Sequence, residues 1–206
     1  NQSRNLKLET TQKKKPVKQE KLSNAPGKAN MSDQPPAKVV IDTNVVVQAY
    51  TFYPKHLQYG SCPFQYQLVR AFREGYFIWL WNEDILTEYW ETLNDSRYQQ
   101  YLAKRGGHID RAIYQQDERL IRFAGEAVKL TVETLAEARR LIVSPGRPRK
   151  LRDLDDALFL ATAKEGNAVY LVSEDQSIRS MGTEYGGSKI VVWWQMLQDL
   201  GYPVTK

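Results

Sequence analysis

The stretch Lys38-Val-Val-Ile-Asp-Thr-Asn-Val-Val-Val47 decides how the rest of the chain is organised. A β-branched run that ends in an acid is typical of the first strand of a buried parallel sheet, and it places Asp42 at the carboxyl edge of that sheet. Open α/β sheets bind their ligands at this edge. Asp42 also fits a simpler role as the N-cap of the next helix, so a functional interpretation depends on other acids reaching the same edge.

Strand and helix patterns alternate along the remainder of the chain. We expect further strands over residues 76–81, 128–132, 168–173 and 189–193. We expect helices over residues 45–50, 64–73, 83–93, 98–126 with a break near Gly106-Gly107, 134–142, a segment that Asp153 or Asp155 caps and Gly166 ends, and 194–200. This alternation predicts a three-layer α/β/α fold with a central parallel sheet of four to five strands and right-handed crossovers.

The composition excludes several classes of protein. No apolar run approaches the ~18 residues of a membrane span, and the N-terminus is too polar for a secretory signal. The single cysteine excludes an internal disulfide framework and a cysteine-rich zinc site. The presence of only two histidines argues against any other kind of zinc site. We therefore expect a soluble, cytoplasmic protein.

The positive charge of the chain is concentrated near its N-terminus. Residues 1–30 hold eight Lys or Arg and two Glu, which leaves 21 basic and 22 acidic residues in the rest. Residues 1–37 also lack periodic apolar spacing, so we predict a disordered basic extension there and one folded domain over residues 38–206. Because that domain is nearly neutral, a nucleic-acid site on it has to be local.

Four acids are placed by the predicted elements to meet at one edge of the sheet. Asp42 and Asp175 each follow a strand, Asp156 lies in the first turn of a helix, and Glu88 lies on the helix after the second strand. Each has an ordinary alternative role as a helix cap or a solvated helix residue. Together, with no His or Cys among them, they predict an oxygen-only site suited to Mg²⁺ or Mn²⁺, which also offsets their mutual repulsion.

A basic loop leads directly into the helix of Asp156. It carries Arg147, Arg149, Lys150 and Arg152 within six residues. The loop is either a solvated basic segment or a patch that contacts the phosphates of RNA, and the sequence leaves both interpretations open.

Four segments in order resemble the acidic motifs of PIN-domain nucleases. They are Val39-Val-Ile-Asp-Thr-Asn-Val45, Ile85-Leu-Thr-Glu-Tyr89, Asp156-Ala-Leu-Phe-Leu-Ala-Thr-Ala163 and Leu171-Val-Ser-Glu-Asp175. The resemblance covers residues 38–200, and it is greatest to the PIN-family (VapC-like) toxins of bacterial type II toxin–antitoxin pairs.

The resemblance implies a metal-dependent endoribonuclease that cuts single-stranded RNA and leaves a 5′-phosphate and a 3′-hydroxyl. It implies that the catalytic and metal-binding acids are Asp42, Glu88, Asp156 and Asp175, with Asn44 and Ser173 as supporting polar residues. It further implies an antitoxin protein as a partner and a homodimer.

The carry-over of residues is less direct at three places. Glu174 stands at a position where such proteins have various residues, and it is a further candidate to approach the metal. Asp153 and Asp155 stand beside Asp156 and are alternatives for the third acid, although the register Asp-Ala-Leu-x-Leu-Ala favours Asp156. Gln176-Ser-Ile stands where such proteins commonly have a further acid, so an auxiliary ligand is missing there.

Two other functions are consistent with a fold of this type. A catalytically inactive PIN-like module would act through protein contacts, but it would have no reason to gather four acids. A structure-specific DNA nuclease would use long helical insertions to thread DNA, and the chain lacks them.

Overall fold

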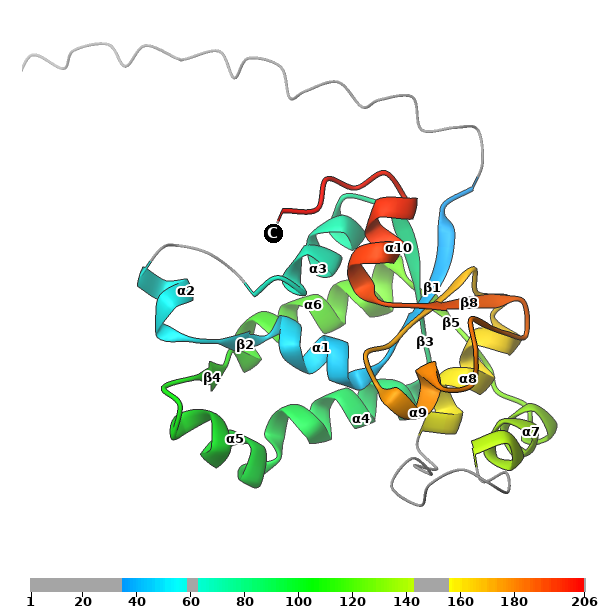
Figure 1. Cartoon of the computed structure of the whole chain (residues 1–206), viewed down its shortest axis with the longest axis horizontal. Coiled ribbons are helices and arrows are strands. Elements are labelled where there is room, and N and C mark those ends of the chain that lie inside the picture. The colour runs from blue at the N-terminus through cyan, green and yellow to red at the C-terminus, as the bar shows by residue number, and fades with distance from the viewer. Residues whose placement is uncertain (1–34, 59–62, 143–155, 206) are drawn as a thin grey trace, which may run out of the picture. The chain divides into compact units, whose positions relative to one another are not determined.

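A computed structural model describes residues 35–58, 63–142 and 156–205 (Figure 1). Its main sheet has six strands in the order β5-β3-β1-β6-β8-β7. The strands are β1 (Ala37–Ile41), β3 (Phe77–Trp81), β5 (Glu126–Ala127), β6 (Tyr170–Val172), β7 (Glu184–Tyr185) and β8 (Ser188–Val191). All neighbours pair in parallel except β7, which pairs antiparallel with β8. The predicted α/β fold with a parallel sheet is confirmed.

The sheet is one strand wider than the expected upper limit because of a hairpin at its edge. Gly186 and Gly187 have φ values of 58° and 86°, which allow a tight two-residue turn between β7 and β8. The sequence predicts only a turn at this point, since the two residues of β7 are too few to give a strand pattern.

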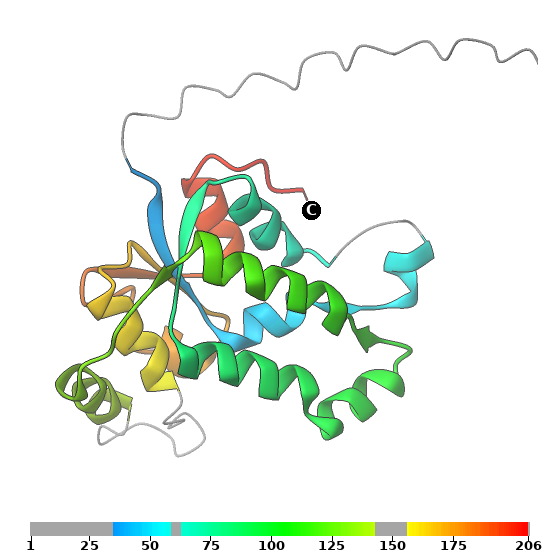
Figure 2. The ribbon, with the colours of Figure 1, turned by 180° about the vertical axis from the view of Figure 1, so that it is seen from behind.

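Helices cover both faces of the sheet (Figures 1 and 2). They are α1 (Thr43–Ala49), α2 (Pro54–Gln58), α3 (Tyr66–Arg73), α4 (Glu83–Asn94), α5 (Ser96–Ala103), α6 (Arg111–Ala124), α7 (Val132–Ile142), α8 (Asp156–Glu165), α9 (Gln176–Arg179) and α10 (Trp193–Asp199). α3 packs with α10, whereas α8 contacts β1, β3 and β6 and carries α7 on its outer side. Right-handed crossovers place α3 and α8 on opposite faces, as the three-layer prediction requires.

The central strand lies in the middle of the hydrophobic core. Val39, Val40 and Ile41 of β1 are fully buried, because helices cover both faces of the sheet around them. The carboxyl end of β1 is therefore held rigidly, and the next residue in the chain is Asp42.

The structure differs from the predicted elements between residues 96 and 132. The expected helical region over residues 98–126 does have its break near Gly106-Gly107, and it forms two helices, α5 and α6, which Asp95 and Asp110 cap through their side chains. Between them β4 (His108–Ile109) pairs antiparallel with β2 (Thr51–Phe52). Gly107 fits there because a Cβ atom would lie 2.9 Å from the ring of Tyr53.

The strand predicted over residues 128–132 was wrong in position. β5 occupies Glu126–Ala127, and α7 already begins at Val132. The apolar run that suggested a strand is instead the connection between them, in which Val128 is buried against the core.

A buried carboxylate fastens α6 to the C-terminal end of α3 and to the residue that follows α1. Asp117 on α6 accepts hydrogen bonds from the Tyr50 hydroxyl at 3.0 Å and from Arg73 Nε at 2.9 Å. Burial, the negative charge of Asp117 and this hydrogen bond hold the pKa of Tyr50 well above its usual range.

No helix in the described part of the chain is both long enough and apolar enough to cross a membrane. The predicted extension over residues 1–37 lies outside the described residues up to Gln34.

Candidate active site

The two central strands end side by side and bring the first and fourth predicted acids to one edge. β1 and β6 pair in parallel with Ile41 opposite Val172, and the backbone N–H of Asp42 donates to the Val172 carbonyl at 2.9 Å. The chain leaves β1 into α1 and leaves β6 into α9. Asp42 and the segment from Ser173 to Asp175 therefore lie at neighbouring strand ends.

Asp42 is a buried carboxylate with one well-placed hydroxyl partner. Asp42 is 2 % exposed, and Ser173 Oγ donates a hydrogen bond to its Oδ2 at 2.7 Å. Burial raises the pKa of Asp42 from 3.8 to about 6. The hydrogen bond from Ser173 lowers this pKa, whereas the negative charge of Asp175 raises it. The site thus holds an acid that is costly to ionise without a nearby cation.

Asp175 is fixed by the same serine and by the start of α9. Its backbone N–H donates to Ser173 Oγ at 3.0 Å, and its Oδ1 accepts from the Ser177 N–H at 2.5 Å. Its second oxygen, Oδ2, lies 3.5 Å from Asn44 Nδ2. Asp175 is therefore the side-chain N-cap of α9 and also faces the start of α1.

Asp156 joins this network through a second serine. It is the first residue of α8 and is 8 % exposed. The Ser177 hydroxyl donates to Asp156 Oδ2. Because the Ser177 backbone N–H binds Asp175, this one residue links the third and fourth acids.

Glu88 reaches the edge from α4 and contacts the residue after Asp42. Thr43 Oγ1 donates to Glu88 Oε1 at 2.6 Å. The next residue, Tyr89, is fully buried and donates its hydroxyl to the carbonyl of Ile41 at the end of β1. α4 is held in register with β1 by this bond, and its N-terminus is capped by Asn82, which accepts from the Ile85 N–H at 2.9 Å.

The structure links Asp42, Asp156 and Asp175 through Ser173 and Ser177 and places Glu88 against Thr43, but it does not bring the four acids into one tight cluster. In residues 35–58, 63–142 and 156–205, no three His, Cys, Asp or Glu side chains are close enough to surround a metal ion. In this arrangement the four carboxylates accept hydrogen bonds from Ser173, Ser177 and Thr43. Ligation of an ion by three of them therefore requires side-chain rotation.

The donor set nevertheless fits a hard divalent cation. It consists of carboxylate oxygens, with hydroxyl and amide oxygens close by, and these are the ligands that Mg²⁺ and Mn²⁺ prefer. The raised pKa of Asp42 reflects an uncompensated buried charge, which a cation would offset.

Six predicted site residues lie outside the described residues. They are the alternative third acids Asp153 and Asp155 and the basic residues Arg147, Arg149, Lys150 and Arg152. Their assignments remain predictions.

Two residues of the network were not among the predicted site residues. Ser177 lies two positions after Asp175, in the segment Gln176-Ser-Ile from which a further acid is missing. Its hydroxyl donates a hydrogen bond to Asp156. Thr43 stands between the predicted site residues Asp42 and Asn44, and this position was the sequence feature that could have identified it as part of the site.

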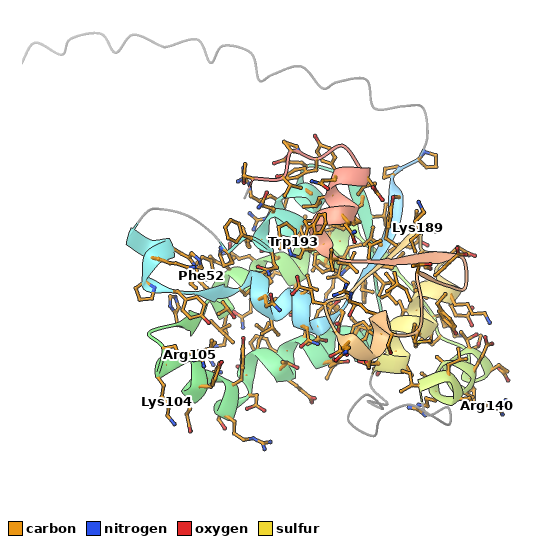
Figure 3. The ribbon with its side chains drawn as sticks, in the orientation of Figure 1. Phe52, Lys104, Arg105, Arg140, Lys189 and Trp193 are labelled. Atoms are coloured by element: carbon orange, nitrogen blue, oxygen red, sulfur yellow. The ribbon has the colours of Figure 1, made fainter. Side chains whose placement is uncertain are left out.

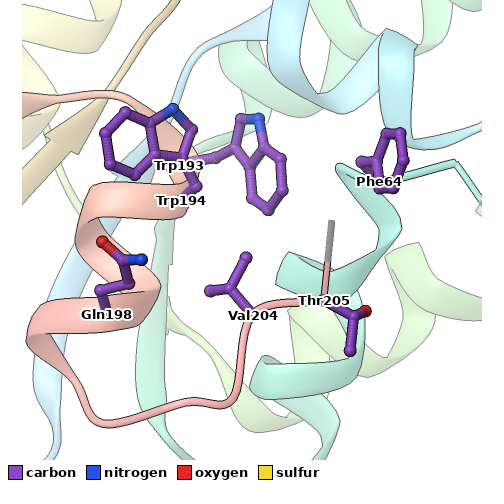
Figure 4. A pocket seen from close by; sticks show the side chains of 6 residues that line it. All are labelled: Phe64, Trp193, Trp194, Gln198, Val204 and Thr205. Atoms are coloured by element: carbon purple, nitrogen blue, oxygen red, sulfur yellow. The ribbon is translucent and has the colours of Figure 1, made fainter.

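A separate apolar pocket of about 350 Å³ lies between the start of α3 and α10 (Figure 4). The aromatic rings of Phe64, Trp193 and Trp194 form much of its wall, and Val204 and Thr205 approach from the C-terminal segment. None of the four acids lines it.

Comparisons with known proteins identify the family. No curated protein matches the sequence. A crystal structure of PAE2754 from Pyrobaculum aerophilum is similar, with a TM-score of 0.45 and 16% identity, covering 85% of this chain and 99% of the other. The family model described as PIN domain matches residues 38–177, a segment that contains Asp42, Glu88, Asp156 and Asp175. The chain therefore belongs to the PIN domain family.

Proposed function

We propose that this protein is a metal-dependent endoribonuclease that cleaves single-stranded RNA at the edge formed by Asp42, Glu88, Asp156 and Asp175. PIN domains are generally nucleases, which gives the reaction class of phosphodiester hydrolysis. The observation that carries the proposal is the linkage of Asp42 and Asp175, from neighbouring strand ends, through the single hydroxyl of Ser173.

The carboxylates of these four residues are the proposed ligands of Mg²⁺ or Mn²⁺. When bound, such an ion lowers the pKa of a water molecule and neutralises charge that develops on the phosphate oxygens. The protein's contribution is to hold the acids at fixed positions before RNA arrives. Ser173 orients Asp42, and Ser177 orients both Asp156 and Asp175.

The negative charges at the edge favour a state in which a cation is bound there. Without a cation, burial and, to a smaller extent, the negative charge of Asp175 raise the pKa of the Asp42 carboxyl, so ionisation of both carboxyls is disfavoured. A phosphodiester is itself an anion, and the acidic edge alone would repel it. Positive charge at the edge therefore has to accompany substrate binding, from the ion and from basic side chains near the cleavage site.

The basic residues Arg147, Arg149, Lys150 and Arg152 are the proposed source of some of this charge. They directly precede α8 in the sequence, and α8 begins with Asp156. Lys and Arg side chains in such a place contact phosphates without reading the base. They also make affinity for RNA dependent on salt.

A role as the toxin of a type II toxin–antitoxin pair is the more specific form of the proposal. It rests on the resemblance of the four acidic motifs to VapC-like toxins, and it brings with it an antitoxin partner and a homodimer. A cytoplasmic location goes with this role.

Cleavage assays with different nucleic acids test the proposed function. The purified full-length chain is incubated with Mn²⁺ or Mg²⁺ and, in parallel, with single-stranded RNA, duplex DNA and flapped DNA. Cleavage of the RNA to products with 5′-phosphates supports the proposal. Preferential cleavage of flapped DNA would assign a structure-specific DNA nuclease, and absence of cleavage with all three would favour an inactive binding module.

A further inference from the structure

A basic and aromatic surface lies beyond the acidic edge, at the far end of α4. We define the α5–β4 surface by six side chains from α5 to the start of α6: Arg97, Tyr101, Lys104, Arg105, His108 and Arg111. All six are exposed. Lys104 and Arg105 project from this end of the molecule (Figure 3).

The local charge of this surface is positive although the folded domain as a whole is nearly neutral. Residues 96–111 include four Lys or Arg and one acid, Asp110. Asp110 accepts from the Ile113 N–H at 3.0 Å, and Asp95, just before the segment, accepts from the backbone N–H groups of Arg97 and Tyr98. Both acids are therefore turned toward helix N-termini, and the exposed side of α5 presents cations.

An aromatic stack stands in the middle of these cations. The rings of Tyr98 and Tyr101 lie 6.4 Å apart at an interplanar angle of 17°, and the guanidinium of Arg105 lies 4.2 Å from the centre of the Tyr101 ring. Tyr101 is 46% exposed, so the stack is accessible from solvent. A planar guanidinium on an exposed aromatic ring is a platform on which a nucleobase can continue the stack.

A groove with a lining of mixed polarity lies along α5 and β4, on a flank of α5 that the stack does not line. Its volume is about 420 Å³, and its lining includes Gln100, Gly107, His108 and Arg111. This volume falls within the ~300–1,000 Å³ that sites for small molecules and cofactors usually have. Arg111 is held in place by a hydrogen bond from its Nη1 to Asn94 Oδ1 at 3.1 Å, which leaves other guanidinium donors for a phosphate or a base.

α4 connects this surface to the acidic edge. Glu88 lies midway along α4, whose 12 residues end directly before α5, and both views show α5 at the end of α4 remote from β3 (Figures 1 and 2). At 1.5 Å per residue, the six steps along α4 from Glu88 to its end at Asn94 correspond to roughly 9 Å, and α5 begins two residues later. A strand of nucleic acid a few nucleotides long can span that distance.

We propose that the α5–β4 surface binds single-stranded RNA on one side of the cleavage site, with a base stacked on Arg105 and Tyr101 and phosphates held by Arg97 and Lys104, which lie four residues before and three residues after Tyr101 and so share its side of α5. The inference rests on the proposed ribonuclease function and adds a second contact region to it. An acidic peptide would also be attracted by the cations, but it has no use for an exposed aromatic stack beside them. The combination of stack and cations is the arrangement by which proteins bind single strands with little sequence preference.

The test compares RNA oligonucleotides of about 4 and about 16 nucleotides, the range over which single-strand sites extend. Binding is measured by fluorescence anisotropy with the full-length chain carrying Asp42→Asn, so that the RNA is not cut. The Tyr101→Ala/Arg105→Gln variant is made in this background, and cleavage of the short RNA is measured with the same double substitution in the otherwise unaltered chain. Both residues are exposed, so the substitutions leave the core intact.

Lys189→Gln is the matched control. Lys189 is also an exposed cation over an aromatic ring, with its Nζ 5.8 Å from the centre of Tyr170, but it lies on β8 (Figure 3). The control should bind both RNAs as the parent does.

We expect the Tyr101→Ala/Arg105→Gln variant to lose at least about fivefold in affinity for the long RNA, which is the lower end of what one lost stacking interaction costs. Its dependence of affinity on salt should become shallower, and its loss of affinity for the long RNA should exceed its loss for the short RNA. Unaltered affinity for the long RNA, or an equal loss in Lys189→Gln, would overturn the inference. The inference would also be overturned if the parent bound a poly-glutamate peptide more tightly than RNA and the double substitution abolished peptide binding without changing the affinity for RNA.

The outcomes separate this inference from the proposed function. If the unaltered chain cuts the short RNA and the double substitution leaves long-RNA affinity unchanged, only the α5–β4 surface is wrong. If the unaltered chain cuts no RNA but the double substitution still weakens binding of the long RNA, the surface stands and the ribonuclease assignment fails.

Discussion

The Ser173 hydroxyl lies 2.7 Å from Asp42 Oδ2 and donates a hydrogen bond to it. Ser173 Oγ also accepts a hydrogen bond from the backbone N–H of Asp175 at 3.0 Å. The proton of the Ser173 hydroxyl is therefore directed at Asp42. Ser173 is fully buried, and water cannot replace this bond easily. One small side chain therefore sets both the orientation of Asp42 and the ease with which it ionises.

Replacing Ser173 with Ala should raise the pKa of Asp42 above its value of about 6. The hydrogen bond stabilises the ionised carboxylate, and hydrogen bonds to charged groups contribute about 1.5–3 kcal/mol, so the pKa should rise by at least about one unit. NMR titration of the carboxyl carbon of Asp42 in the metal-free protein measures this directly. An unchanged titration would show that Ser173 does not stabilise the carboxylate.

The Asp42→Asn variant should make the metal-free protein more stable at neutral pH. The folded-state pKa of about 6 is higher than the ordinary value of 3.8. Between these two pH values the folded state binds more protons than the unfolded state, so the free energy of unfolding falls as the pH rises through this window. The two-unit difference corresponds to about 3 kcal/mol at pH 7.

Denaturant unfolding at pH 4 and pH 7 checks this expectation. Asn at position 42 should give a gain at pH 7 of up to about 3 kcal/mol and little or none at pH 4. A gain of the same size at both pH values would mean that the effect does not come from ionisation of Asp42.

Asp156→Asn should reduce cleavage far more than Asp155→Asn. Asp156 is buried and accepts a hydrogen bond from Ser177, which also binds Asp175, so it belongs to the network of the proposed site. Turnover of a single-stranded RNA by the two variants decides between them. The reverse order of activities would place the third acid at Asp155.

Asp117→Asn should destabilise the fold without altering the chemistry of the acidic edge. Asp117 is 2 % exposed and holds the Tyr50 hydroxyl and the Arg73 guanidinium, so a neutral amide leaves Arg73 without its anion and cannot satisfy both donors equally well. We expect a loss of about 1–3 kcal/mol in the free energy of unfolding, because a buried group loses a partner. The turnover number of the folded protein should stay the same.

Glu118→Gln is the control for this variant. The neighbouring Glu118 forms an i,i+4 ion pair with Arg122 near the surface, with 3.0 Å between Oε1 and Nε. Such pairs contribute only about 0.2–1 kcal/mol. A loss in Glu118→Gln as large as that in Asp117→Asn would show that burial of the Asp117 carboxylate is not the cause.

The fold could be predicted where burial dictates the sequence. β1 lies in the middle of the sheet, so its residues had to be apolar and β-branched, and the acid after it was readable as a strand end. The regions that were wrong depend on contacts between distant segments. The break near Gly106-Gly107 was readable from the two glycines, but the strand β4 that follows them pairs His108–Ile109 with the distant Thr51–Phe52, and no local pattern records that pairing.

The same reasoning applies to the site. Asp42 and Asp175 each follow a strand, so their common edge was predictable from topology. The role of Ser177 was not, because its hydroxyl binds Asp156, which lies 21 positions earlier in the chain. The absence of a tight acidic cluster among the described residues also depends on side-chain rotamers, and spacing along a sequence does not determine them.

The central claim is that Asp42 and its neighbouring acids bind a divalent cation that RNA cleavage requires. The most direct test titrates Mn²⁺ into RNA cleavage reactions. The reactions contain the unaltered chain, the Asp42→Asn variant or the control Glu184→Gln, which alters an acid of β7 outside the network. The account predicts Mn²⁺-dependent cleavage by the unaltered chain and by Glu184→Gln, abolition of cleavage by EDTA, and no cleavage by Asp42→Asn at any Mn²⁺ concentration. Equal turnover by Asp42→Asn, or cleavage that persists in EDTA, would contradict it.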